Sequence, residues 1–309
     1  MLLVHQFTAL SDNYGYLLPD EATGATACVA TPEARAAPGL RARASPSGAL
    51  GRAALALTPP AHVASAQAAA VDRALREKGY RLTHILNTHH HSDHVGGNLV
   101  GYAVRHRRWP LLTRRAPLQE LKARHGATVV GPAADAARIP GIDVLACDGD
   151  TLSLGASSFR VMHTPGHTTG HCAYYFEAAK AAFVGDTLFS LGCGRMFEGT
   201  PPMFLASLRA LAALPDDTAV YCAHEYTASN GRFALAVEPG NGALVARVAE
   251  VAKLRAAGKP TVPSTIGLEK ATNPFLRQQS PELRKALGLS ASASDVEVFA
   301  AARRKKDTF

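Results

Sequence analysis

The chain has 309 residues, 47% of them hydrophobic, which suits a globular protein with one large core or two cores of ordinary domain size. No apolar run reaches the roughly 18 to 20 residues of a membrane span, and the first residues lack the features of a signal peptide, so we expect a cytoplasmic protein without a membrane partner. The net charge of +8 depends on nine arginines in residues 35–67 and 100–119, without which it would be −1 (8 minus 9), so the charge does not indicate a nucleic-acid partner.

The N-terminal part predicts short strands joined by turns, because polar and apolar residues alternate there. These strands are expected at 2–7, 14–18 and 25–29, in an antiparallel meander. Residues 35–67 are rich in Ala, Pro, Gly, Ser and Arg and show no sustained period, which is typical of a loosely packed loop. A helix is expected from about residue 68 to Gly79, and a buried strand at 83–87 then ends directly before a cluster of histidines.

From residue 128 the alternation returns and predicts five more strands, separated by Gly, Asp or Pro. They are expected at 128–132, 151–154, 158–164, 172–176 and 181–186. Leucines at helical spacing then predict a helix up to Leu214, and one further strand is expected at 219–223. Beyond His224 the sequence predicts only helices and loops. The helices are expected at 227–237, 241–257, 281–287 and 293–306. An α/β part up to about residue 226 and a small helical part after it follow from this order.

The five cysteines predict buried free thiols. They are odd in number, scattered and never spaced as CxxC, which argues against a disulfide framework or a zinc ribbon. They stand at Cys28, Cys147, Cys172, Cys193 and Cys222.

The strongest chemical signal is THHHSDHVGG at residues 88–97, which follows a strand and opens a helix. Its metal-binding side chains are His89, His91, Asp93 and His94. Alternate residues of an extended backbone point to one side, and His94 then comes from the first helical turn. Imidazole nitrogens and carboxylate oxygens suit zinc or iron. A solvated polar loop would be the better interpretation of one histidine, but four such side chains within six residues favour a metal site.

Three more candidate ligands stand at strand ends in the second half: His167 in TPGHTTGH, Asp186 in FVGDT and His224 in VYCAHEY. Each alone is more often structural, yet an α/β scaffold usually places its site at strand ends. Together with the cluster they provide five histidines and two aspartates, enough for two metal ions that share a carboxylate. We expect His90 to point away from this site, and His163 and His171 to orient loops.

The motifs HxHxDH, TPGHT, GDT, GCG with a following basic residue, and HEYT, in this order, resemble the hydroxyacylglutathione hydrolase (glyoxalase II) family of the metallo-β-lactamase superfamily. The resemblance runs from LSDNY at 10–14 through VEPGN at 237–241, PTVPST at 260–265 and NPF at 273–275 to the terminal ARRKKDTF, and leaves out 35–67 and 100–119. HxHxDH alone identifies only the superfamily. The resemblance implies an α/β fold, with an αββα sandwich over residues 1–226 and a helical substrate-binding domain over 227–309.

The resemblance also implies an activity, namely hydrolysis of S-D-lactoylglutathione and related thioesters, the second step of methylglyoxal detoxification. Two divalent metal ions are expected, zinc before iron or manganese. The first would bind His89, His91 and His167, the second Asp93, His94 and His224, with Asp186 bridging. A hydroxide between the ions would be the nucleophile, since two cations lower the pKa of water from about 16 toward about 7. Asp93 and Asp186 are accordingly the expected catalytic residues, and we expect a monomer.

Glutathione carries two carboxylates, so its site needs fixed donors a peptide's length from the metals. The family's positions for these donors match Arg195, Tyr226, Arg303 and Lys306. Without the resemblance, the terminal ARRKK run would be interpreted as a solvated basic tail. Phe197 stands where some relatives carry a tyrosine, which implies one hydrogen bond fewer to the substrate.

Competing functions stay open on the sequence alone. A persulfide dioxygenase shares the fold and histidines but uses a single iron and would lack the helical C-terminal domain. A class B β-lactamase would usually carry a cysteine where Asp186 stands, and a tRNA-processing nuclease would add a basic arm. A non-catalytic metal-binding relative is the alternative if the two unusual segments disrupt the site.

We expect residues 35–67 and 100–119 to be insertions that are dispensable for chemistry. The second interrupts what the sequence predicts to be one helix from His94 to Lys122. Both segments lack acidic residues and end in glutamine, whose CAG codon can contain an intron's closing AG. Lineage-specific loops and translated introns are therefore both hypotheses for their origin.

Overall fold

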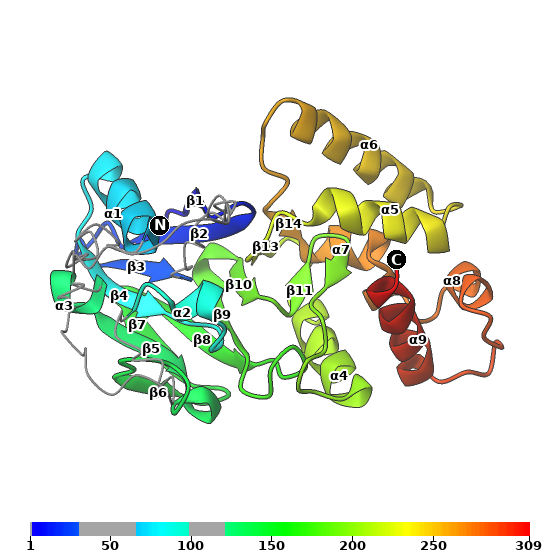
Figure 1. The fold of residues 1–309 in the computed structure, drawn as a ribbon, viewed down its shortest axis with the longest axis horizontal. Helices are drawn as coiled ribbons and strands as arrows, with labels where there is room; N and C mark the ends of the chain where they lie inside the picture. Colours follow the sequence, from blue (N-terminus) through cyan, green and yellow to red (C-terminus); the bar gives the residue numbers. More distant parts are fainter. Residues whose placement is uncertain (1, 31–65, 99–120) are drawn as a thin grey trace, which may run out of the picture.

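Two six-stranded sheets stack face to face with helices at their outer sides (Figure 1). The computed structural model describes residues 2–30, 66–98 and 121–309. The strand orders are β1-β2-β3-β4-β5-β6 and β14-β13-β10-β9-β8-β7. The α/β sandwich predicted from the sequence is thus confirmed, whereas the predicted insertions lie outside the described residues, apart from positions 66 and 67.

The first sheet begins as an antiparallel meander, as predicted, and continues with parallel strands. Its strands are β1 (His5–Ala9), β2 (Asn13–Pro19), β3 (Thr26–Val29), β4 (Leu82–Leu86), β5 (Thr128–Pro132) and β6 (Val144–Ala146). Tyr16 and Leu18 of β2 pack between the sheets, whereas Leu17 packs in the cluster that includes Val71 of α1 (Ala66–Lys78). Because β2 is buried on both faces, its apolar run is nearly continuous.

The second sheet pairs antiparallel except between β10 and β13, which run parallel. Its strands are β7 (Thr151–Leu154), β8 (Ser157–His163), β9 (Cys172–Phe176), β10 (Ala181–Gly185), β13 (Ala219–Cys222) and β14 (Ser264–Thr265). A separate hairpin joins β11 (Leu188–Phe189) to β12 (Gly192–Cys193). Strands β4, β10 and β13 end close to the residues singled out as candidate ligands, so the sheets bring together segments that are far apart in sequence.

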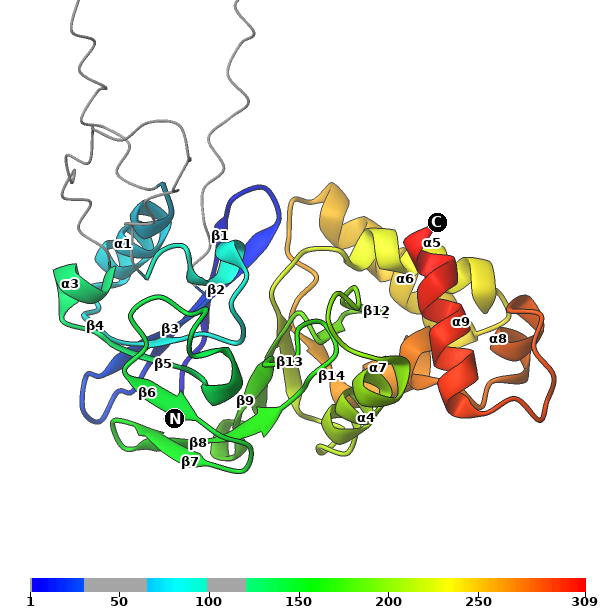
Figure 2. The same cartoon turned by 60° about the horizontal axis from the view of Figure 1, so that its bottom comes forward.

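The helices after residue 226 gather at one end of the molecule, opposite α1 and α3 (Figures 1 and 2). The remaining helices are α2 (Ser92–Val95), α3 (Leu121–His125), α4 (Pro201–Ala212), α5 (Thr227–Val237), α6 (Gly242–Ala256), α7 (Ile266–Thr272), α8 (Pro281–Ala286) and α9 (Asp295–Asp307). The start of α9 is fixed by a capping box, in which Ser294 caps the backbone of Glu297 and the Glu297 carboxylate binds the Ser294 amide in return.

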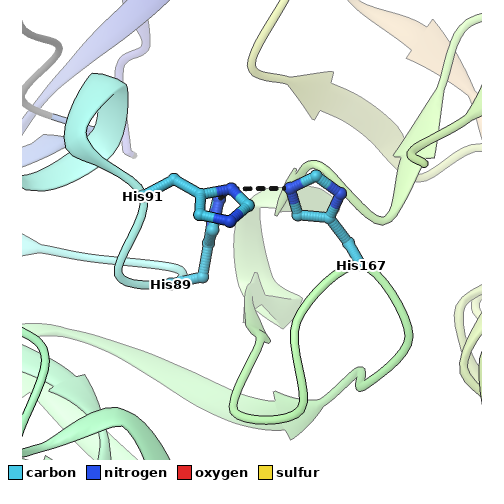
Figure 3. Close-up of side chains that lie close together, drawn as sticks. All are labelled: His89, His91 and His167. Atoms are coloured by element: carbon cyan, nitrogen blue, oxygen red, sulfur yellow. Dashed lines mark hydrogen bonds between the residues drawn. The ribbon is translucent and has the colours of Figure 1, made fainter. Parts of the chain in front are cut away.

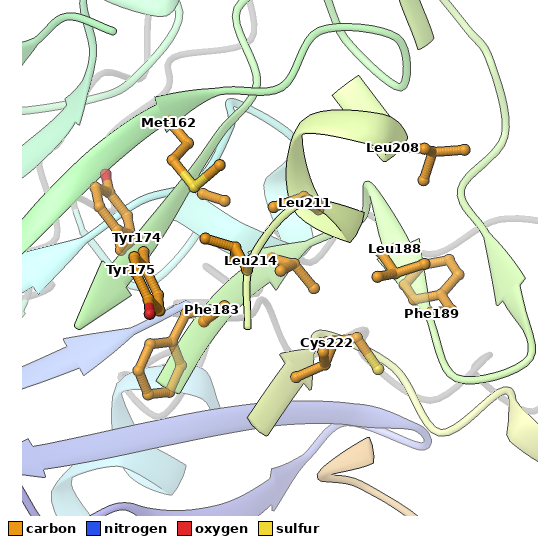
Figure 4. Close-up of a cluster of buried hydrophobic side chains, with 14 of the residues drawn as sticks. Met162, Tyr174, Tyr175, Phe183, Leu188, Phe189, Leu208, Leu211, Leu214 and Cys222 are labelled. Carbon is orange, nitrogen blue, oxygen red and sulfur yellow. The ribbon is translucent and has the colours of Figure 1, made fainter. Parts of the chain in front are cut away.

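One continuous core joins the two sheets to the C-terminal helices; Figure 4 shows part of it between the second sheet and α4. Tyr16 of the first sheet meets Phe183 of the second, with ring centroids 5.4 Å apart. Phe204 of α4 meets Phe299 of α9 at 5.7 Å. Because α9 is anchored by buried aromatic side chains, the basic residues near its end have a fixed position relative to the sheets.

Several sequence predictions were wrong in detail. The first strand begins at His5 instead of Leu2. Helix α2 ends at Val95 instead of continuing up to the segment 100–119. The region after His224 contains the short strand β14 as well as helices, and α7 was missed. Cys147 is exposed, whereas the other four cysteines are buried free thiols. Among the described residues, no helix is long and apolar enough to cross a membrane.

Candidate metal centre

The seven candidate ligands meet at one edge of the sandwich, on loops that follow β4, β8, β10 and β13 and in the short helix α2. Five of the seven are buried, and His91 and Asp93 are partly exposed at the mouth.

The HxHxDH segment leaves β4 extended and then turns into α2. The Asn87 amide donates to Val130 O (2.9 Å), and its side-chain Nδ2 donates to His94 O (2.8 Å), so one residue fixes both ends of the loop. His91 is still extended (φ −61°, ψ 145°), and its carbonyl accepts the His94 amide at 2.8 Å to open the helix. The predicted change from strand to helix is therefore confirmed at this point.

A first group of ligand atoms comes from His89, His91 and His167 (Figure 3). His91 Nδ1 lies 3.0 Å from His89 Nε2 and 2.9 Å from His167 Nε2. Nitrogens bound about 2.0–2.1 Å from one tetrahedral ion would lie about 3.3 Å apart. The three rings therefore converge closely enough to share one ion.

A second group comes from Asp93, His94 and His224. Asp93 Oδ2 lies 3.4 Å from His224 Nε2 and 3.7 Å from His94 Nε2. These separations also suit ligands of a single ion.

Asp186 lies between the two groups of ligand atoms, and each of its two carboxylate oxygens faces a different group. Oδ2 is 3.4 Å from His167 Nε2, whereas Oδ1 is 3.3 Å from His94 Nε2 and 3.5 Å from His224 Nε2. Asp186 Oδ1 is buried and has no hydrogen-bond partner among the described residues. A buried carboxylate oxygen without a hydrogen bond is costly unless a cation binds it, so the donor set fits a pair of metal ions.

The backbone around Asp186 leaves no room for adjustment. His171 is buried, its Nε2 accepts the Asp186 amide at 3.1 Å, and its ring stacks on His89. Gly185 has φ +49°, and a Cβ at this position would lie 2.7 Å from His171 Nε2. The interpretation of His171 as an orienting residue thus fits its contacts, and glycine is required immediately before Asp186.

The side chains not expected to be ligands have other partners. His90 Nδ1 lies 2.9 Å from Asp135 Oδ2, and His163 Nε2 lies 3.0 Å from Thr169 O. His90 therefore faces away from the two groups.

The protonation states match metal binding at the first group. Burial, followed by the charges of His94 and His171, holds the pKa of His89 well below its usual value. Burial and the charge of His167 lower the pKa of His91 to about 4. Both rings are therefore neutral at pH 7, the form that binds metals.

The second group and the adjacent Asp186 together carry two carboxylates, those of Asp93 and Asp186. Burial opposes ionisation of Asp186, but the charges of His224 and His94 hold its pKa well below the usual value. Burial likewise opposes protonation of His224, yet Asp186 and Asp12 raise its pKa strongly. A divalent cation would balance these carboxylates in place of the proton on His224.

A cavity of about 570 Å³ opens over both groups and carries a cationic wall. Among its lining residues are the four predicted substrate contacts: Arg195, Tyr226, Arg303 and Lys306. Arg195 is exposed, and the ring of Tyr226 stacks on that of His224 at 4.8 Å between centroids. Burial, together with Arg303, Arg232 and Arg195, lowers the pKa of Lys306 to about 8. This part of the cavity therefore attracts anions.

Arg303 is buried, and all three nitrogens of its guanidinium donate to the protein itself. It is 4% exposed, and its Nη1 donates to Cys193 O at 2.9 Å. Its Nε and Nη2 donate to Asp307 Oδ1 at 3.1 and 2.8 Å. Arg303 thus fixes the turn that precedes Arg195 and contributes charge to the cavity from within the wall.

Sequence reasoning missed several residues around the site. Phe189, Asn230 and Phe309 line the cavity, and Asp12 and Asn13 contact ligand side chains. The only available signal for the last two was their place in the LSDNY segment of the resemblance.

Comparisons with known proteins show which families the chain resembles. A family model described as the metallo-beta-lactamase superfamily matches residues 51–224, and one described as the hydroxyacylglutathione hydrolase C-terminus matches residues 225–309. The chain is 47% identical to a hydroxyacylglutathione hydrolase of Methylococcus capsulatus, over 100% of this chain and 99% of the relative. It is 44% identical to one of Brucella anthropi, over 100% and 97%.

Solved structures share the fold at lower identity. ETHE1 from Myxococcus xanthus superposes with a TM-score of 0.56 at 23% identity, over 99% of both chains. A metallo-beta-lactamase from Staphylococcus aureus superposes with a TM-score of 0.54 at 17% identity, over 99% of this chain and 71% of that one. At such identities the likeness concerns the fold alone.

Proposed function

The chain belongs to the hydroxyacylglutathione hydrolase family of the metallo-β-lactamase superfamily and is a thioester hydrolase. On this premise, we propose that it cleaves S-D-lactoylglutathione and related hydroxyacyl-glutathione thioesters at a centre of two divalent metal ions. The observation that carries the two-ion centre is Asp186, whose two oxygens face two groups of ligand atoms. The family's C-terminal domain at residues 225–309 favours this function over a dioxygenase.

The proposed ligands divide into two sets with one shared residue. His89, His91 and His167 would hold the first ion, Asp93, His94 and His224 would hold the second, and Asp186 would serve both. The nitrogen separations of 2.9 and 3.0 Å around His91 support the first set. The contacts of Asp93 Oδ2 support the second.

When bound, the two ions would lower the pKa of a shared water from about 16 toward about 7 and polarise the thioester carbonyl. The chain's own task is to keep the ligands in their binding forms. The neutral rings of His89 and His91 each offer an unprotonated nitrogen to a metal ion, and the ionised Asp186 offers both of its oxygens. The departing glutathione thiol has a pKa of about 8.5, so its expulsion needs no side-chain acid.

The substrate's carboxylates are held by the cationic wall. Arg195 and Lys306 act as direct partners, and Tyr226 offers its hydroxyl at the rim. Arg303 acts mainly by fixing the Cys193–Gly194 turn, because its donors already have partners. Phe197 is 62% exposed, and its ring lies 5.6 Å from that of His91, so it would form an apolar wall beside the reacting acyl group.

Zinc is the proposed metal, because nitrogen and carboxylate ligands at tetrahedral spacing suit it. The domain boundary is proposed at residue 226, where β13 gives way to the helices that carry Lys306. A cytoplasmic location is proposed from the free cysteines of the described residues, which suit a reducing compartment.

The test of this function is thiol release from S-D-lactoylglutathione by the purified enzyme. We expect rapid thiol release from S-D-lactoylglutathione. An oxygen ester of lactate and a β-lactam serve as comparison substrates. Failure to release thiol from any hydroxyacyl-glutathione thioester, by protein that contains metal, would contradict the proposal.

A further inference from the structure

The turn between β1 and β2 connects the first sheet to the end of β13. Tyr14 N donates to Ala223 O at 2.8 Å, and Glu225 N donates to Asp12 O at 2.9 Å. Asn13 and His224 form an isolated antiparallel bridge between these two hydrogen bonds. The turn therefore lies directly against the backbone of a proposed metal ligand.

Two side chains, Asp12 at the end of this turn and Asn13 at the start of β2, contact ligands of the second ion. Asp12 Oδ1 lies 3.2 Å from His224 Nδ1, the ring nitrogen opposite the one that faces Asp93 and Asp186. A carboxylate at Nδ1 keeps the proton there and leaves Nε2 as the ligand atom. Asn13 Nδ2 donates to Asp93 Oδ2 at 3.3 Å, and Asn13 is buried.

The turn is itself held in place from behind. Tyr14 OH donates to Glu225 Oε2 at 2.6 Å, and Glu225 also accepts from the amide and hydroxyl of Thr261 at 2.9 and 2.7 Å. Thr261 is buried in the segment that follows α6. Asp12 and Asn13 are therefore presented by a backbone that has fixed partners on both sides.

The ligands of the first ion are oriented by other groups. His167 Nδ1 lies 2.8 Å from Arg195 O, and His89 Nδ1 lies 3.1 Å from Thr88 Oγ1. Among the described contacts, none joins the first set to residues 11–14. A change in this turn should therefore act on one ion and spare the other.

We propose that Asp12 and Asn13 are positioning residues for the second metal ion: Asp12 fixes the tautomer and orientation of His224, and Asn13 fixes the carboxylate of Asp93. This inference rests on the proposed two-ion centre. The SDNY segment would then orient the ligands of the second ion, and changes in Asp12 or Asn13 would alter the affinity for the second ion without altering the affinity for the first.

The experiment is a metal titration of the full-length apoprotein with Co²⁺, followed by its visible absorption, and with Zn²⁺ against a chromophoric chelator. Loss of an outer partner typically weakens metal binding by about 10–100-fold. Asp12→Ala and Asn13→Ala should weaken one equivalent by about this factor and leave the other unchanged. Asp12→Asn, which keeps an acceptor oxygen but not the charge, should fall between Asp12→Ala and the wild type.

Ser11→Ala is the matched control, since it changes an exposed side chain of the same turn and should bind both equivalents as the wild type does. Thermal unfolding of each variant identifies misfolding, and Asp12→Asn keeps the test available if an alanine variant does not fold. Equal weakening of both equivalents, or of neither, in a folded Asp12 variant would overturn the inference. A wild-type protein that binds fewer than two ions would instead contradict the proposed function.

Discussion

The metal centre and the cationic wall share one cavity, yet they are built differently. The centre uses short side chains at the ends of strands, most of them buried and held by backbone contacts. The wall uses Arg195 and Lys306, long side chains that are exposed or half-buried. Short side chains on rigid strand ends hold the reacting groups in a fixed geometry, whereas long flexible side chains change the affinity for substrate. Changes in the centre should therefore abolish turnover, and changes in the wall should alter substrate binding by degrees.

The largest effect is expected for Asp186→Ala. The two oxygens of Asp186 face both groups of ligands, so the variant should bind less metal than the wild type. It should hydrolyse the thioester more than about 100-fold more slowly, because loss of a ligand should cost more than the roughly 10–100-fold typical of losing an outer partner. Metal analysis and thiol release on one preparation measure both effects. Asp217→Ala, which removes an exposed aspartate paired with Lys180, is the control. A variant that kept both ions and most of its turnover would contradict a shared carboxylate.

The next effect separates two adjacent histidines. His91→Ala should cost metal and rate together, because Nδ1 of His91 is the meeting point of the first group. His90→Ala should reduce turnover by less than about tenfold, because its ring binds Asp135, which keeps its ion pair with Arg138. Equal losses in the two variants would mean that this loop faces the other way.

Within the wall, Lys306→Ala should raise KM for glutathione thioesters about threefold to tenfold with little change in kcat, and this effect should shrink at high salt. Arg303→Ala should raise KM and also lower the free energy of unfolding by about 1–3 kcal/mol, because it removes the buried hydrogen bond to the carbonyl of Cys193. Steady-state kinetics and denaturant unfolding measure the two quantities. Unchanged KM in both variants would remove the wall from substrate binding.

A smaller effect concerns pH. The pKa of Lys306 is lowered to about 8, first by burial and then by the neighbouring arginines. The ammonium is therefore charged below pH 8 and loses its charge as the pH rises through this value, so KM should increase above pH 8. Lys306→Arg, which stays charged throughout, should flatten the profile. A wild-type KM that is constant from pH 6.5 to 9.5 would show that this charge does not bind substrate.

The smallest effect is expected from deleting the two segments. Leu121 N donates to Gly97 O at 3.3 Å, and removal of 100–119 would leave these residues four positions apart, the spacing of an α-helical hydrogen bond. Joining Leu99 to Glu120 should therefore preserve metal content and turnover. For the first segment the junction should keep residues 66 and 67, because α1 already begins at Ala66. A folded deletion variant without activity would show that one segment belongs to the site, and sequencing the mature transcript would distinguish loops from introns.

Much of the fold was accessible from the sequence, because long apolar patterns dominate local structure. The strand Thr128–Pro132 and the helix Thr227–Val237 were predicted at the residues the structure gives. The three-residue strand Val144–Ala146 and the two-residue strand Ser264–Thr265 were missed, since elements this short carry no period.

The site shows the same contrast. Spacing alone indicated the candidate ligands of the HxHxDH segment, because they lie close together in the sequence. The burial of Arg303 and the contact of Asp12 with His224 depend on packing between distant segments, which one sequence does not reveal.

The most direct test is the metal content of the purified protein, measured per chain by elemental analysis after equilibration with Zn²⁺ and removal of loosely bound ions. The two sets of ligands joined by Asp186 predict two ions per chain. One ion per chain, in a preparation that hydrolyses the thioester at its full rate, would contradict the two-ion centre.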